Sequence, residues 1–334
     1  GGNIVYLEST GTDNKYLWLV VAVAGHEVDA FESVWFNDNK IWGDGNYFNN
    51  WGSFVSISFY EGDQTAADSA LVSASSKWTT DHKLLDTAYM VLKLTYDVDK
   101  FANGLPNIST IVRGKKVLDP TSITAGSFVV GKKYQISAVG NTNFTAIGAS
   151  ANTVGVEFTA TGVGSGTGTA LLIDWSDNPA LCAYDYLRDT KYGLGETVAN
   201  ILTASVTTAK SVCDQTVQIK PASDNITQKR YTINGVVDTA NSIKNNMEQM
   251  LGSMIGRLVY SGGQFEIHAG AYVAPAFTID ESVAVGEITV QTKQSRRSAY
   301  NGVKGVFLSE DDNYTMADYP AQISSSYATA DGDP

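Results

Sequence analysis

The chain is poor in the residues that catalysis and metal binding most often use. Its 334 residues include two cysteines and three histidines, and the histidines, His26, His82 and His268, lie far apart in the sequence. Cys182 and Cys213 form no Cys-x-x-Cys pair, and two cysteines are too few for a disulfide framework. We therefore predict no zinc site, two cysteines that are buried as small hydrophobic residues, and assembly in a reducing compartment.

Positive charge and long apolar runs are also scarce. The chain has 23 Lys+Arg against 35 Asp+Glu, which gives a formal net charge of −12. Nonspecific nucleic-acid binding needs cations that displace counterions from phosphates, and docking onto an anionic membrane needs them too, so both partners are disfavoured. No apolar run approaches the ~18 residues of a spanning helix, and the first residues lack a signal-peptide pattern. We expect a soluble chain.

No catalytic motif is complete. A Gly-x-Ser-x-Gly elbow is absent, and the glycines that alternate over residues 162–168 lack the Lys-Ser/Thr ending and the strand-to-helix context of a phosphate loop. We interpret them as a flexible connection. Two acidic pairs, Asp174 with Asp177 and Asp311 with Asp312, invite comparison with glycosidases. Neighbours in sequence seldom face each other across a sugar, so we predict turns there, with no catalytic residue, no metal and no cofactor.

Strand and turn patterns, by contrast, are abundant. Gly is plentiful at 31 residues and Pro scarce at 7, a composition that with frequent Val, Thr and Tyr favours strands and tight turns over long helices. Alternating or continuous apolar runs predict a hairpin at Ser33–Trp42 and a central strand at Thr87–Tyr96. Further strands are expected at Tyr16–Ala24 and Phe54–Tyr60, and a strand pair at 108–118.

Residues 121–170 differ from the rest in composition. Lys132, Lys133 and Glu157 are their only charged residues, nine residues are Gly, and Thr is frequent. A fifty-residue loop with regular aromatic and β-branched spacing would be unusual, so we predict an inserted β module. Its strand candidates are Ser127–Val130, Tyr134–Val139, Phe144–Ile147 and Val156–Thr161.

Helices are predicted only after this segment. Asn178-Pro179 supplies a cap and a first-turn proline for a helix near 178–190, and a short helix is expected near 206–214. A Met-rich helix near 241–257 is the clearest, because Met247, Leu251, Met254 and Ile255 recur at three- and four-residue steps. We interpret this stripe as core and not as a binding groove. A hairpin with a Gly-Gly turn follows it.

Several motifs, taken in order, resemble one family. The run Asp174–Leu187 (Asp-Trp-Ser-Asp-Asn-Pro-Ala-Leu-Cys-Ala-Tyr-Asp-Tyr-Leu), followed by Lys191–Gly195, is similar to a signature of the tail-tip proteins of lambda-type phages with long, non-contractile tails. The segments Leu105–Ser109 and Val112–Pro120 resemble what precedes it there. The family order continues with Tyr231–Asp238, the Met-rich helix, Leu258–Gly263, Ala269–Tyr272, Ser295–Arg297 and Tyr300–Gly305. In such relatives the Asp-Pro and Trp-Ser-Asp-Asn-Pro segments lie close together, whereas here 121–170 separates them.

The resemblance implies a structural virion protein and not an enzyme. It implies the hub region of the tail tip, with β-barrel-like domains forming a trimeric ring that caps the tail tube and supports host attachment and genome ejection. The implied partners are copies of the chain and the tail-tube, distal-tail and tape-measure proteins, while DNA passes without specific binding. Assembly would occur in the host cytoplasm. Family members continue into further hub, fibronectin-like and receptor-binding parts, so receptor recognition is not assigned to these residues.

We therefore predict a β-rich α+β chain with a first hub domain (1–120), the inserted module (121–170) and a second hub domain (171–334) that is incomplete relative to the family. Arg296 and Arg297 form, with Lys293 and Lys304, a basic stretch in an acidic chain. We predict that at least one of the two arginines contacts an Asp or Glu of a neighbouring subunit or of an adjoining tail protein. Two alternatives remain. Six Trp and 17 Tyr suit an adhesin or carbohydrate-binding module, and the acidic pairs leave a polysaccharide-cleaving tail enzyme open.

Overall fold

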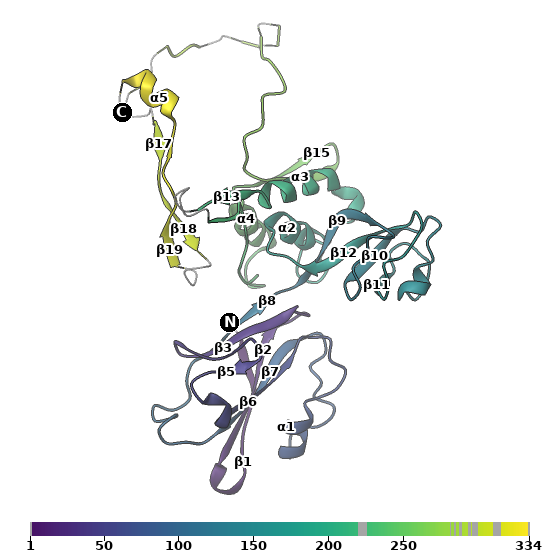
Figure 1. Ribbon diagram of the computed structural model, residues 1–334, viewed down its shortest axis with the longest axis vertical. Coiled ribbons are helices and arrows are strands. Elements are labelled where there is room, and N and C mark those ends of the chain that lie inside the picture. Colours follow the sequence, from purple (N-terminus) through teal and green to yellow (C-terminus); the bar gives the residue numbers. More distant parts are fainter. Residues whose placement is uncertain are drawn as a thin grey trace. The chain divides into compact units, whose positions relative to one another are not determined.

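The protein is built mainly of short antiparallel sheets (Figure 1). The computed structural model describes residues 2–219, 226–280, 282–283, 285–286, 289–292, 295, 300–309 and 315–332. In these residues strands far outnumber helices, which confirms the predicted β-rich α+β class. The chain divides into two compact units, Gly1–Ser176 and Asp177–Pro334.

The first unit begins with two four-stranded sheets that share one core. One sheet has the order β1 (Asn3–Thr10), β2 (Tyr16–Ala24), β7 (Ala88–Thr95), β6 (Val55–Tyr60). The other has the order β5 (Asn46–Tyr47), β4 (Asn39–Gly43), β3 (Ala30–Phe36), β8 (Ile108–Arg113). Side chains of both sheets, such as Leu19, Phe36 and Leu92, form a single buried cluster between them. The arrangement is a β-sandwich.

Strands β2 and β7 are continuously apolar because both of their faces are covered. Leu19 and Val21 face the other sheet, whereas the alternate residues Trp18 and Val20 belong to a second cluster on the opposite face. That cluster is covered by helix α1 (Ser69–Ala74), which Asp68 caps by accepting a hydrogen bond from the Leu71 backbone. The central position predicted for β7 is confirmed. Helix α1 was not predicted, because it spans only six residues.

The second part of this unit is a four-stranded sheet around a small aromatic core. Its order is β11 (Glu157–Thr159), β10 (Lys133–Ala138), β12 (Thr169–Trp175), β9 (Lys116–Thr124). Phe128, Tyr134, Phe144 and Phe158 pack together in its core. Strands β9 and β12 run through both predicted boundaries of the insert, so the sheet begins before residue 121 and ends after 170. That the insert is a self-contained module stays a prediction.

Three strand predictions in this region are wrong. Segments 108–113 and 114–118 do not pair with each other, because β8 pairs with β3 and β9 with β12. Residues 127–130 form no strand, since only Phe128 is buried while Val129 and Val130 are exposed. Residues Phe144–Ile147 form a 3₁₀ turn, η3. Its start is held by the Asn152 side chain, which accepts hydrogen bonds from the backbone N–H groups of Phe144 and Thr145.

The second unit contains the predicted helices. They are α2 (Pro179–Arg188), α3 (Thr203–Cys213) and α4 (Ile243–Gly252), and the predicted hairpin is β15 (Arg257–Ser261) with β16 (Gln264–His268). The Asn178 side chain caps α2 as expected. Asn246 of α4 donates a hydrogen bond to the Tyr186 hydroxyl of α2 (3.1 Å), and both side chains are buried. The Gly262-Gly263 turn has positive φ at both residues, as its two-residue loop requires.

The Met-rich helix is shorter than predicted. It ends at Gly252, so Met254 and Ile255 lie in the turn that follows. Met247, Leu251 and Met254 are buried as expected, but Ile255 is 72% exposed with φ of 50°. The predicted helix was too long because the apolar residues after Gly252 keep the helical spacing although the backbone there forms a turn.

The remaining described elements are short. They are η1 (Thr12–Asn14), η2 (Trp51–Ser53), η4 (Val198–Asn200), β13 (Thr216–Gln218), β14 (Thr227–Lys229), β17 (Gly302–Val303), β18 (Val306–Ser309), β19 (Thr315–Asp318), β20 (Gln322–Ile323) and α5 (Ser325–Asp331). All sheets in the described residues are open. The barrel-like form implied by the resemblance is therefore not found in this part of the chain.

Candidate functional site

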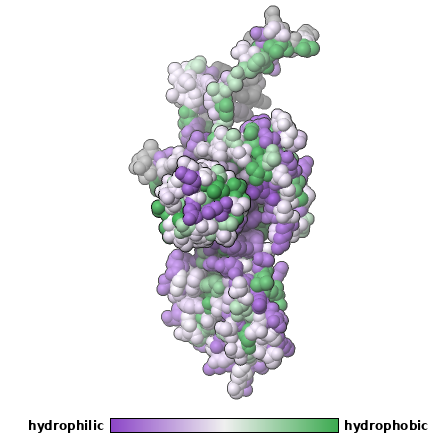
Figure 2. Space-filling view, turned by 90° about the vertical axis from the view of Figure 1, so that its right-hand side faces the viewer, coloured by the Kyte–Doolittle hydropathy of each residue, from purple (hydrophilic) through white to green (hydrophobic). Residues whose placement is uncertain are grey.

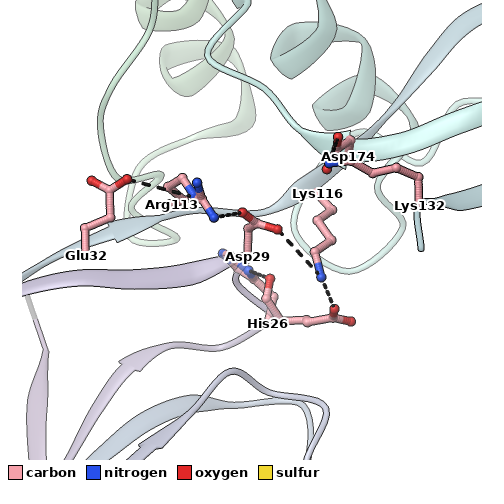
Figure 3. Close-up of polar contacts among 8 residues, drawn as sticks. His26, Asp29, Glu32, Arg113, Lys116, Lys132 and Asp174 are labelled. Carbon is pink, nitrogen blue, oxygen red and sulfur yellow. Dashed lines mark hydrogen bonds and ion pairs between the residues drawn. The ribbon is translucent and has the colours of Figure 1, made fainter. Parts of the chain in front are cut away.

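A group of charged side chains lies where β8 passes into β9. It comprises Glu27, Asp29, Glu32, Glu61, Arg113 and Lys116, and we call it the junction cluster. Figure 3 labels four of these residues, Asp29, Glu32, Arg113 and Lys116. Arg113 is the last residue of β8 and Lys116 the first of β9. Between them, the carbonyls of Arg113 and Gly114 accept hydrogen bonds from the backbone N–H of Asp29. The loop after β2 is thereby fixed to the exit of the sandwich.

Asp29 is the centre of the junction cluster. Its carboxylate lies 2.8 Å from Nη2 of Arg113 and 3.9 Å from Nζ of Lys116, which in turn lies 2.9 Å from Glu27. The Arg113 guanidinium also faces the ring of Trp175 at 5.8 Å. The loop between β2 and β3 thus supplies carboxylates to both cations, Asp29 to Arg113 and to Lys116 and Glu27 to Lys116.

The pKa shifts in the junction cluster follow from this packing. Burial raises the pKa of Glu61, and the nearby carboxylates of Asp63, Asp29 and Glu27 add to the rise while Lys116 opposes it. Burial lowers the pKa of Lys116, but its hydrogen bond to Glu27 and the acidic neighbours outweigh burial, so the net shift is upward. Lys116 therefore remains a firmly charged ammonium and not a neutral base.

Each described member of the predicted acidic pairs has its own lysine. Asp174 is ion-paired with Lys132 (Figure 3), and Asp177 lies 2.6 Å from Nζ of Lys229. Lys229 also lies 3.6 Å from Asp214. Asp311 and Asp312 lie outside the described residues.

The histidines and cysteines do not come together as a reactive group. His26 bonds the Glu27 carbonyl, His82 bonds Thr79, and His268 lies 3.1 Å from Glu266. No group of three metal-binding side chains occurs in the described part of the chain. Burial raises the pKa of the Cys182 thiol to about 12 and that of Cys213 to about 11, so both are protonated thiols near neutral pH.

Of the four alternating glycines, predicted to form a flexible connection, Gly168 is buried, whereas Gly166 is exposed. Thr167 donates its backbone N–H to the Asn141 side chain (2.7 Å), and Gly168 donates to the Thr142 hydroxyl (2.9 Å). A Cβ on Gly168 would lie 2.5 Å from the Val139 carbonyl oxygen, so glycine is required by close approach. No phosphate-binding role is needed to account for this glycine.

Two features missed by sequence analysis are the junction cluster and the exposed edge of β1. The cluster joins residues up to 89 positions apart, and only the flanking cations around Gly114 hint at it. Strand β1 carries the exposed residues Ile4, Val5 and Leu7 at the end of its sheet. The predicted contact residues Arg296 and Arg297 lie outside the described residues, and the described neighbour Lys304 is exposed.

Comparison of the sequence with protein-family models and with curated proteins gives no match. In the described residues, no helix has both the length and the apolar character needed to cross a lipid bilayer.

Proposed function

We propose that this chain is a structural virion protein, the hub region at the tail tip of a phage with a long, non-contractile tail. The observation that carries the proposal is the ordered series of motifs from Leu105 to Gly305 that resembles the lambda-type tail-tip family. Copies of the chain would form a trimeric ring that caps the tail tube and surrounds the path of the tape-measure protein and DNA. The net charge of −12 suits a conduit that must not retain DNA.

The way the structure uses these motifs is consistent with a scaffold. The segment Val112–Pro120 supplies both cations of the junction cluster, and Asp174–Leu187 supplies the capped helix α2 with its buried Tyr184 and Leu187. The resembling residues thus fix chain direction and core packing. The proposal assigns them no catalytic role.

The carbohydrate-binding alternative has less support. Stacking on sugars needs aromatic faces on the surface, and the insert's aromatic residues are buried in its core, as their spacing predicted. The polysaccharide-cleaving alternative would need two carboxylates facing a shared cleft, whereas Asp174 and Asp177 each bind a lysine.

Arg296 and Arg297 remain our proposed contacts with a neighbouring subunit or an adjoining tail protein. A ring of acidic subunits needs positive charge at its seams, and arginine can bind a carboxylate through two hydrogen bonds. Replacing both by alanine should weaken assembly while each subunit stays folded. Assembly equal to that of the parent across a salt series would refute this contact.

Electron microscopy of the purified chain tests the function. A threefold ring, or docking of the chain onto the end of isolated tail tubes, is the expected result. A monomer that neither forms rings nor binds tubes would contradict the hub, and release of reducing sugar from a capsular polysaccharide would favour the enzyme instead.

A further inference from the structure

Strand β1 is an open sheet edge beside an uncovered apolar surface. It pairs only with β2, and among the described residues no backbone hydrogen bond reaches its outer edge. Leu7 is opposite Leu19 and Ile4 opposite Val21, and these two partners face the sandwich core. Leu7 is nevertheless 54% exposed, because the second sheet does not extend over β1. The core face therefore continues past the end of the sandwich without a cover.

Strand β1 has little of the usual protection of a sheet edge. Natural edges are blunted by lysine, proline, inward-pointing charge or β-bulges, and β1 has of these one irregularity, between Ile4 and Tyr6. The only charged residue of β1 is Glu8, whose carboxylate accepts a hydrogen bond from Tyr6 (2.7 Å) on the strand's other face. Such an edge is built to accept another strand.

A second segment of the chain is extended and has no strand partner among the described residues. Residues 271–280, which we call the arm, form no helix or strand, and every one of them is exposed. Figure 1 draws the arm as an extended trace, and Figure 2 shows hydrophobic residues exposed along the extended segment at the top of the view. No hydrogen bond within the described residues involves positions 271–279. Phe277 is 70% exposed and Ile279 78%.

The sequence of the arm suits an added strand. Between residues 271 and 279 it has no charge, and its β-branched and aromatic residues favour strands. In an extended conformation Val273, Phe277 and Ile279 share one face. Pro275 lacks an N–H and is tolerated only where that position points away from the neighbouring strand. The arm can therefore end a sheet but cannot lie inside one.

We propose that the arm of one copy adds as a strand to the β1 edge of a second copy, with Phe277 and Ile279 covering Ile4 and Leu7. Strand β1 and the arm belong to different units, and among the described residues neither the outer edge of β1 nor the arm has a strand partner within its own unit. A second copy would supply each with one. Edge and arm are both nearly uncharged, so they can meet although the chains are acidic overall. The contact is head-to-tail, and such contacts close into a ring where the rotation from copy to copy closes and otherwise extend as a filament. It deepens the proposed function, because it assigns the contact by which copies would associate.

Two single substitutions test the two sides of the contact, the β1 edge and the arm, one at a time. Leu7→Lys protects the edge and leaves the arm intact, while Ala276→Pro removes a backbone N–H on the pairing side of the arm and leaves its apolar side chains. Both sites are exposed and outside the cores, so folding should be retained. Val236→Lys is the matched control, since it replaces an apolar residue that is 81% exposed elsewhere.

Sedimentation of the full chain over a concentration series tests the proposal. The parent and Val236→Lys should self-associate. The association constant of each test variant should be lower by a factor of about ten or more. An equimolar mixture of Leu7→Lys and Ala276→Pro should form a one-to-one dimer, because one intact arm then meets one intact edge. Association of the parent with no rescue in the mixture would overturn the arm–edge contact yet leave the hub standing. A parent chain that is monomeric at every concentration would overturn both the arm–edge contact and the hub. If the two substitutions each destabilise that monomer, the arm pairs with β1 of its own chain.

Discussion

The carboxylate of Asp29 lies 2.8 Å from the guanidinium of Arg113, and this pair ties the loop after β2 to the last residue of β8. Asp29 has only 18% of its side chain exposed, whereas Arg113 has 43%. The pair is therefore partly screened by solvent, and its contribution exceeds that of a surface pair without reaching that of a fully buried one. Arg113 ends β8 and Lys116 begins β9, so the pair lies where the chain leaves the sandwich for the next sheet.

Asp29→Asn should lower the free energy of unfolding by about 1–2 kcal/mol, because Arg113 and Lys116 each lose an ionised acceptor. Asp44→Asn is the control, since Asp44 is 89% exposed and its pair with Lys40 spans 3.9 Å. The control should change stability by less than about 0.5 kcal/mol. Urea unfolding measures both variants, and equal effects would show that the junction cluster holds nothing in place.

A deletion of the insert should have its end points chosen from the strand pairing and not from the change in composition at residues 121 and 170. Ala125 donates its backbone N–H to the Gly168 carbonyl (2.9 Å), so the chain ends on either side of residues 126–167 already meet. Joining them through an Asn-Gly turn would convert β9 and β12 into a hairpin. We expect a folded chain whose sandwich melts near the parent temperature.

Removal of residues 121–170 should be more harmful, because it deletes the paired residues Ser122, Ile123 and Thr124 of β9. Circular dichroism melts of the two deletions make the comparison. If both deletions unfold the chain, residues 121–170 are not a self-contained module.

The sequence predicts a structural feature well when the residues that determine the feature lie close together in the chain. Strands β2 and β7 followed from apolar runs, and α2 followed from Asn178-Pro179, because each signal lies within one element. The turn at Phe144 did not, since its cap comes from Asn152 through the fold of the insert. The junction cluster and the uncovered edge of β1 could not be predicted from the sequence either. Both depend on which strands become neighbours, and a single sequence does not specify that pairing.

Leu251 and Ile255 should respond oppositely to substitution although they lie in one apolar stripe of the sequence. Leu251 is buried, and its truncation to alanine should cost about 2–5 kcal/mol. Ile255 is exposed and has φ of 50°, a conformation unfavourable for a β-branched side chain. Ile255→Gly should therefore leave the melting temperature unchanged or raise it. A loss as large as that of Leu251→Ala would mean that Ile255 is covered in the folded protein.

The two cysteine thiols should be nearly inert in the native protein at pH 8. Burial raises the pKa of Cys182 to about 12, aided by the carboxylates of Asp185 and Asp177, and that of Cys213 to about 11. Relative to an ordinary thiol, the thiolate fraction of Cys182 falls about a thousandfold at this pH. Reaction with a thiol-specific disulfide reagent should be slow for the folded chain and fast in urea, with Cys182→Ser and Cys213→Ser identifying each phase.

The same shifts give stability a dependence on alkaline pH. The folded-state pKa of each thiol lies above its unfolded value, so folding favours the protonated form. That contribution is complete below the unfolded pKa of about 8.5 and is lost as the pH rises through the folded-state values of about 11 and 12. Replacing both cysteines by alanine should therefore flatten the decline in unfolding free energy over this range. A decline as steep as that of the parent would assign it to other groups, such as Tyr89, whose pKa burial raises to about 12.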